Sequence, residues 1–160
     1  MILSIFLPHE EFTIVSNLGN NKIKKILQEN VEPYQQRIFG LFNPYPNNHK
    51  KFAGIIKFKS NEFQINRIIH YKNGALPIIT GEIEDKRINI KMRVDSLQVK
   101  VLYLLFGLPI FLAITQPERA GAYLFIISCF YILMMGGFKI ESKIQRKFLL
   151  RIFKGKLVIK

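Results

Sequence analysis

The chain has 160 residues and one cysteine, so it allows one ordinary domain with an anchor and excludes a disulfide framework and every multi-cysteine metal site. Lysine and arginine outnumber aspartate and glutamate by 24 to 11, and the net charge of +13 excludes an acidic disordered tail and indicates an anionic partner, either nucleic acid or a lipid surface. Hydrophobic residues make up 49% of the chain and the mean hydropathy is +0.14, but the apolar residues are not evenly spread, and two long blocks contain no charge, which is typical of a membrane segment.

The first part of the chain, residues 1–96, is expected to form a cytosolic β-rich domain, because its apolar residues recur mostly at every second position. A short helix is expected to begin at Asn20 or Asn21, either of which can cap it, and to end before Pro33. The other elements expected before the main group of strands are strands over 12–16 and 34–42 and a loop over 43–51.

Four alternating strands follow and predict an antiparallel meander. They are expected over 52–58, 63–69, 76–84 and 86–95, with turns at Ser60-Asn61, at Tyr71 to Gly74 and at Glu84 to Lys86. The last strand is expected to be half-buried, because apolar side chains alternate with Arg87, Lys91 and Arg93. The sequence therefore predicts a basic outer face on this strand.

Four short motifs in these strands form a set: Phe63-x-Ile65-x-Arg67, Tyr71-Lys72-Asn73, Leu76-Pro77-x-Ile79-x-Gly81-x-Ile83 and Ile90-Lys91-Met92-Arg93. Over residues 52–115, the chain resembles a family of uncharacterised small bacterial two-helix membrane proteins with a cytosolic β-rich domain. The resemblance implies this architecture and carries no activity, cofactor or site residue. The chain departs from the family pattern at Gly74-Ala75, where a small polar residue and then a bulky one are expected.

Two uncharged apolar blocks follow, and they predict a transmembrane helical hairpin over 97–138. The first helix is expected over about 97–116, where Lys100 extends its ammonium toward the headgroups, and the second over 120–138. At about 1.5 Å per residue, each helix approaches the roughly 30 Å of a hydrocarbon core. The alternative is a buried hairpin in a soluble core, which a chain of this size has little mass to cover.

The distribution of basic residues predicts the orientation of this hairpin. Three basic residues precede the first helix closely and five follow the second, whereas the connecting loop has only Arg119. The first ten residues lack the basic region of a signal peptide. We therefore expect a multi-pass protein of the plasma (inner) membrane with both termini in the cytoplasm.

The C-terminal segment, residues 139–160, has eight basic residues and one acidic residue. Spacing by four of Ile140, Ile144, Phe148 and Ile152 predicts an amphipathic helix to about Phe153. Two alternatives stay open: the helix lies on an anionic leaflet, or it packs on the β-rich domain. The candidate contacts for anionic lipid are Arg87, Lys91, Arg93, Lys143, Arg146, Lys147 and Arg151.

The sequence has no recognisable catalytic, cofactor or metal site. The histidines lie far apart without ligand spacing, and the glycines form no phosphate-binding loop. Glu82, Glu84 and Asp85 are the only candidate acid–base set that we find, and their place at a hairpin turn favours a solvated face. Cys129 lies within the second apolar block, where a thiol is protonated and packs as a small hydrophobe.

Together these patterns predict an α+β membrane protein with an antiparallel β-meander domain, a short helix, a transmembrane hairpin and a C-terminal amphipathic helix. We expect it to present the β-rich domain at the membrane surface and to bind a protein partner or anionic lipid. The alternatives are an accessory subunit of a larger membrane complex and a membrane-bound enzyme with an unrecognised site. Nucleic acid is disfavoured, because the basic residues cluster beside the apolar helices and not on an aromatic platform.

Overall fold

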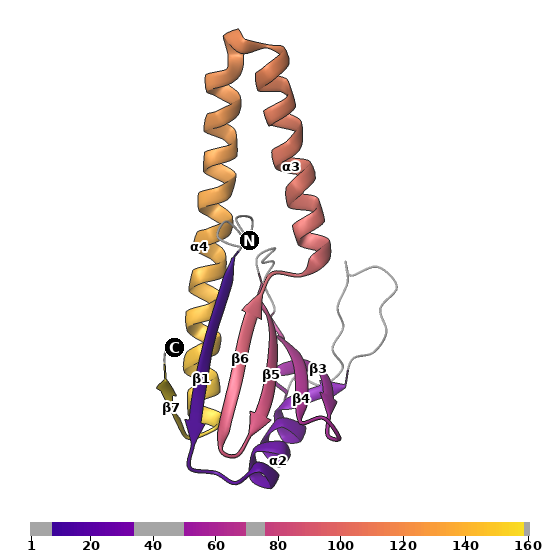
Figure 1. The fold of residues 1–160 in the computed structure, drawn as a ribbon, viewed down its shortest axis with the longest axis vertical. Coiled ribbons are helices and arrows are strands. Elements are labelled where there is room, and N and C mark those ends of the chain that lie inside the picture. The colour runs from indigo at the N-terminus through magenta and orange to yellow at the C-terminus, as the bar shows by residue number, and fades with distance from the viewer. Residues whose placement is uncertain (1–7, 34–49, 70–75, 159–160) are drawn as a thin grey trace.

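The structure is a computed structural model, and it describes residues 8–33, 50–69 and 76–158. It is an α+β fold in which two long helices project from one end of a seven-stranded sheet (Figure 1). The strands are β1 (His9–Ser16), β2 (Val31–Pro33), β3 (Phe52–Lys57), β4 (Glu62–Arg67), β5 (Ile78–Glu84), β6 (Arg87–Arg93) and β7 (Gly155–Val158). The helices are α2 (Asn20–Asn30), α3 (Ser96–Thr115) and α4 (Ala120–Ile152), with a 3₁₀ turn, η1 (Pro117–Arg119), between the last two.

The sheet has the order β2-β3-β4-β5-β6-β1-β7. The predicted four-strand meander is confirmed as β3 to β6, each antiparallel to the next. The sheet as a whole is mixed, because β2 pairs parallel to β3, so the expectation of a purely antiparallel sheet is wrong. The expected turn at Tyr71 to Gly74 and the expected strand over 34–42 lie outside the described residues.

Short-range chemistry explains the turns and the first helix. Asp85 and Lys86 both have positive φ, which is the backbone of a two-residue type I′ hairpin between β5 and β6. The predicted helix is confirmed as α2, but the predicted asparagine cap is wrong, because Gly19 is the N-cap and no side chain caps the helix. The Asn20 side chain accepts a hydrogen bond from the Lys86 backbone N–H instead, at 3.3 Å.

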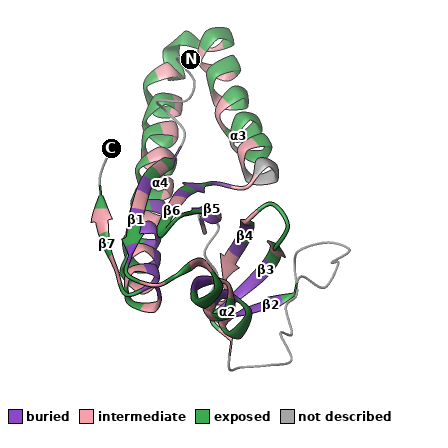
Figure 2. Cartoon of the chain, turned by 60° about the horizontal axis from the view of Figure 1, so that its bottom comes forward, coloured by how far each residue is buried: buried purple, intermediate pink, exposed green. Residues whose placement is uncertain are grey.

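One face of the sheet carries the hydrophobic core. Side chains of α2 and α4 pack on this inner face, and the three form a single buried cluster (Figure 2). The second apolar block and the C-terminal segment form one continuous helix, α4, whose lower part lies along the sheet (Figure 1). Of the two alternatives for the C-terminal helix, the structure has the one in which it packs on the β-rich domain, through Phe138, Leu149 and Phe153.

The rotation of α4 differs from the expected one. The predicted apolar stripe begins with Ile140 and Ile144, but both are exposed, at 63% and 40%. Glu141, Ser142 and Gln145 are buried against the sheet in their place. Periodicity identified the apolar stripe but not the side that faces the sheet, so the packed alternative holds with a different buried face from the one that the stripe predicts.

Close approach of two strands makes Gly54 a sensitive position. A Cβ atom on Gly54 would lie 2.1 Å from the Gln64 carbonyl oxygen and 2.7 Å from the Ile65 Cα atom, both of them backbone. Backbone atoms yield less readily than a side chain, so we predict that Gly54→Ala destabilises the sheet by about 1–3 kcal/mol. Thermal unfolding followed by circular dichroism in detergent measures the change. Gly107→Ala is the control, because no atom lies within 4 Å of its Cβ position, and equal stability of the two variants would contradict the prediction.

Candidate functional site

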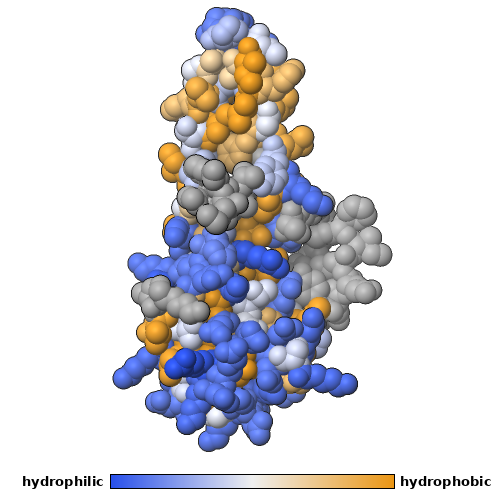
Figure 3. Space-filling model, viewed as in Figure 1, coloured by the Kyte–Doolittle hydropathy of each residue, from blue (hydrophilic) through white to orange (hydrophobic). Residues whose placement is uncertain are grey.

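The paired helices α3 and α4 carry most of the exposed apolar surface of the described residues. Large apolar side chains are exposed on all sides of both helices beyond the end of the sheet (Figure 2). In the space-filling view this region is mainly hydrophobic, whereas the surface over the sheet is mainly hydrophilic (Figure 3). Only 6% of the most apolar 18-residue window of α4 is buried, so the alternative of a hairpin buried in a soluble core is wrong.

Among the described residues, one helix is long and apolar enough to cross a membrane. It comprises η1 and α4, residues Pro117–Ile152, with a mean hydropathy of 1.8 in its most apolar window. The apolar part of α3, Val99–Thr115, is shorter. The two helices contact each other through Phe106 and Tyr131, whose ring centroids are 6.5 Å apart. The structure thus has a helical hairpin, but the expectation of two membrane spans is not supported, because only one of the described helices is long and apolar enough for a span.

The predicted lipid contacts fall into two groups on opposite sides of the sheet. Arg87, Lys91 and Arg93 point away from the core on the outer face of β6. Lys143, Lys147 and Arg151 are exposed on α4, which covers the inner face. The structure therefore does not bring all seven residues into one patch.

Two of the predicted contacts are engaged in ion pairs. Arg146 donates a hydrogen bond to the Glu10 carboxylate at 2.7 Å, and this contact connects α4 to β1. Lys91 lies 3.2 Å from the Glu11 carboxylate on the outer face. The hydrogen bond from Lys91 is the largest of the effects that lower the pKa of Glu11 below its ordinary value, and it outweighs partial desolvation.

The basic residues of α4 also differ in their distance from the apolar part of this helix. At about 1.5 Å per residue, Lys143 lies roughly 8 Å beyond Phe138 along the axis, Lys147 roughly 14 Å and Arg151 roughly 20 Å. Charge interactions decay over about 8 Å at physiological salt. If the apolar part lies in a bilayer, Arg151 is too far away for a direct headgroup contact.

The contact between α4 and the sheet contains an unusual group of buried polar side chains. Arg67 of β4 donates a hydrogen bond to the Glu141 carboxylate at 3.0 Å, and the Glu141 side chain is only 3% exposed. Next to this ion pair in the helix, Ser142 and Gln145 are both fully buried. Neither the Ser142 hydroxyl nor either polar atom of the Gln145 amide has a hydrogen-bond partner.

The outer face of the sheet is open and hollowed. A trough of about 320 Å³ lies over β3, β4, β5 and β6. Its lining combines apolar, acidic and basic side chains, including Ile55, Lys57, Glu62, Thr80, Glu82 and Lys91. Glu62 and Glu82 are direct cross-strand neighbours, and such a pair of like charges destabilises a sheet. Lys57, 3.9 Å from Glu62, reduces the repulsion.

The candidate acid–base residues lie on an exposed part of β5 and in the turn that follows it. Glu82 and Glu84 are exposed on the outer face of β5, and Asp85 lies in the turn that follows. Asn89 donates a hydrogen bond to Glu84 at 3.2 Å. The described part of the chain contains no group of three or more histidine, cysteine, aspartate or glutamate side chains placed to hold a metal ion.

Comparison of the chain with models of protein families, with curated proteins and with solved structures finds no match. Geometry therefore carries the functional argument. Sequence reasoning missed the residues that join α4 to the sheet, namely Glu10, Arg67, Glu141, Ser142 and Gln145. The signal was present in the polar residues at 141, 142 and 145, which share the side of the helix opposite Ile140 and Ile144.

The buried amide of Gln145 leads to a stability prediction. A buried polar group without a partner costs about 1–3 kcal/mol. We therefore predict that Gln145→Leu, which keeps a similar volume and removes the amide, stabilises the fold by an amount of that order. Thermal unfolding in detergent measures it. Gln64→Leu on the exposed outer face is the matched control, and a Gln145→Leu variant less stable than the wild type would show that the amide has a partner in solution.

Proposed function

We propose that the chain is a small integral membrane protein that presents a binding sheet at the cytosolic surface of the plasma membrane. The observation that carries the proposal is the exposure of apolar side chains around the whole circumference of α3 and of α4 up to Phe138. In water this surface has no cover from the described part of the chain, and exposed apolar patches of this extent mark membrane or protein contacts. In a bilayer it is solvated by lipid.

The proposal places α3 in the bilayer as a second span beside α4. Its 20 residues extend about 30 Å, the thickness of a hydrocarbon core, if Lys100 extends its ammonium to the interface. Pro109 lies inside α3, and such a residue is tolerated where a neighbouring helix shields the freed backbone group. The short η1 connection leaves Arg119 as the basic residue on the far side.

The orientation follows from the basic residues near the ends of the two helices. Lys100 of α3 and the basic residues of α4 after Phe138 lie at the end nearer the sheet, while Arg119 lies at the opposite end. Positive charge is retained on the cytoplasmic side. The sheet and the C-terminal β7 are therefore assigned to the cytosol.

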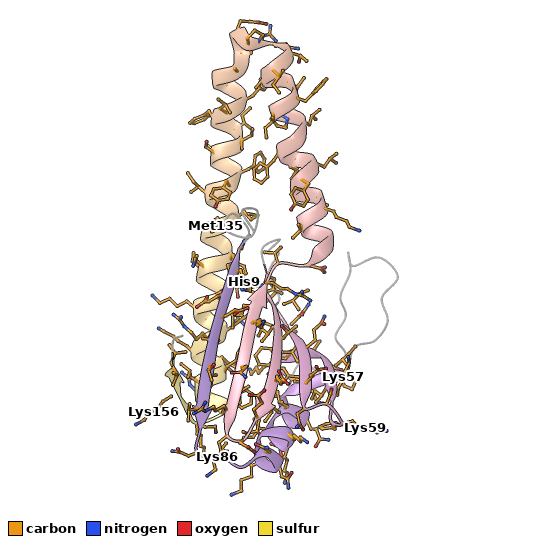
Figure 4. The ribbon with its side chains drawn as sticks, viewed as in Figure 1. His9, Lys57, Lys59, Lys86, Met135 and Lys156 are labelled. Carbon is orange, nitrogen blue, oxygen red and sulfur yellow. The ribbon has the colours of Figure 1, made fainter. Side chains whose placement is uncertain are left out.

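A cysteine-labelling experiment tests insertion and orientation. In a Cys129→Ala background, which removes the native thiol, single cysteines replace Lys59, Lys156 or Glu118, all exposed. Lys59 and Lys156 lie on the sheet end of the molecule (Figure 4). We predict that an impermeant maleimide labels Glu118→Cys in intact cells and labels Lys59→Cys and Lys156→Cys only after permeabilisation. The reverse pattern would show that the sheet lies outside the cell. Labelling of all three positions from the same side of the membrane would show that α3 and α4 do not both span it.

The functional surface that we propose is the outer face of the sheet. The inner face is covered by α2 and α4, so the outer face is the one broad sheet surface that the described residues leave free. Its trough offers an exposed apolar side chain, Ile55, with carboxylates and ammonium groups around it. A mixed surface of this kind suits a protein partner better than a uniformly charged ligand.

Co-purification in mild detergent tests this surface. We predict that Ile55→Glu together with Thr80→Lys reduces partner recovery by at least about tenfold, because burying an uncompensated charge at an interface costs more than about 1.4 kcal/mol. Lys86→Glu, at the exposed β5–β6 turn, is the control and retains the partner. Equal recovery with both variants would place the partner elsewhere. A stoichiometric complex would make the chain an accessory subunit.

A further inference from the structure

The polarity of α4 reverses partway along the part that lies beside the sheet. In the turns from Lys139 to Gln145, the buried side chains are Glu141, Ser142 and Gln145, whereas Ile140 and Ile144 are exposed. Uncharged and paired polar side chains thus face the protein, and the outward side carries the two isoleucines together with Lys139 and Lys143. This arrangement is the one that helices adopt where their surroundings are lipid.

The remaining turns have the opposite polarity. Leu149 and Phe153 are fully buried against the sheet, while Lys147 and Arg151 are exposed. This arrangement is the ordinary one for a helix whose outer side is in water. The change between Gln145 and Leu149 indicates that the surroundings of α4 change there from lipid to water.

A row of lysines runs beside the two exposed isoleucines. Lys139, Lys143 and Lys147 are all exposed and recur every four residues, so they line one side of α4. Side chains on a helix lean toward its N-terminus, which for α4 is the direction of the apolar part. The one acidic residue between Lys139 and Ile152, Glu141, is buried in its pair with Arg67. The exposed side of these turns is therefore purely cationic and apolar.

We propose that α4 from Lys139 to about Gln145 is embedded in the headgroup layer of an anionic leaflet, with Ile140 next to the upper acyl chains, Ile144 in the outer part of the headgroup layer and the three lysines on lipid phosphates. The inference rests on the proposed membrane insertion. At about 1.5 Å per residue, Ile144 lies roughly 9 Å beyond Phe138. A headgroup layer is roughly 5–8 Å thick on each side of the bilayer.

This placement changes which predicted residues contact lipid. Lys143 and Lys147 lie in or next to the layer, joined by Lys139. His9, which pairs with Arg93 in the sheet, lies at the hairpin end of β1, near the level of Met135 (Figure 4). Lys86, next to Arg87, lies at the opposite end of the sheet, so Arg87 is in water. The hairpin end of the sheet thus meets the membrane surface.

Spin-label accessibility in lipid nanodiscs tests the depth. In the Cys129→Ala background, single cysteines at Leu133, Ile140, Ile144 and Arg151 carry a nitroxide, and its collisions with oxygen, which concentrates in lipid, are compared with those of a water-soluble nickel complex. We expect oxygen to dominate at positions 133 and 140, the two agents to collide at comparable rates at 144, and nickel to dominate at 151. Lipid exposure at 133 with water exposure at 144 would overturn this inference alone, whereas water exposure at 133 would overturn the proposed insertion. Exclusion of both agents at 140 and 144 would show a protein covering the face, and would also overturn the inference.

A second arm tests the lysines with lipids of defined charge. The collisions of the nitroxide at position 144 with oxygen and with nickel are measured in phosphatidylcholine nanodiscs that contain increasing fractions of phosphatidylglycerol. We expect added phosphatidylglycerol to move this label deeper into the bilayer and so to raise its collisions with oxygen relative to nickel. Each basic residue near an anionic leaflet contributes about 1 kcal/mol, so replacing Lys139, Lys143 and Lys147 by glutamine weakens the association with the anionic leaflet by about fivefold per lysine and shifts the response to higher phosphatidylglycerol fractions. The matched control replaces Arg151, Lys154 and Lys156 by glutamine and leaves the response unchanged. Equal responses of the two triple variants, or no dependence on phosphatidylglycerol, would overturn the assignment of the lysines.

Discussion

The architecture depends on one continuous helix, α4, whose two parts differ in character. Its first 18 residues, 120–137, are uncharged and none of them is buried, and its last turns complete the core of the sheet. No break separates these parts, so the direction in which the helix leaves the sheet fixes the direction of the apolar hairpin. The sheet is consequently held at the base of the hairpin as a rigid extension of it, and not on a flexible tether.

Two ion pairs fix the rotation of α4 about its own axis. Glu141 contacts Arg67 from β4, and Arg146 contacts Glu10 from β1, so the helix is held from both sides. A buried ion pair contributes little stability compared with apolar packing, but it discriminates among alternative arrangements. That discrimination matters here because Ile140 and Ile144 offer an apolar alternative for contact with the sheet. Without the pairs, a rotated α4 would bury the isoleucines and expose Glu141.

Only the strands and helices that a local residue pattern encodes were predictable from the sequence. Alternation predicted β3 to β6 within a few residues, and the uncharged blocks predicted both long helices. β7 was not predicted, because four residues at the end of the chain become a strand only through pairing with β1. The buried face of α4 was also missed. Periodicity shows that a helix has two sides but not which side faces protein, and at Ile140 the apolar side faces outward.

The position of β1 between β6 and β7 has a consequence for biosynthesis. β1 is among the first described segments of the chain, but its two neighbours are made much later, and one of them is nearly the last segment. The part of the inner face that α4 covers stays bare until the lower part of this helix has left the ribosome, and the buried Ser16 hydroxyl donates its hydrogen bond to the Phe153 carbonyl only then, at 2.6 Å. Because synthesis runs from the N-terminus, the hairpin emerges before the sheet is complete. Closure of the sheet therefore follows synthesis of the hairpin, and a chain cut before Glu141 would leave one edge of β1 unpaired and part of the apolar core bare.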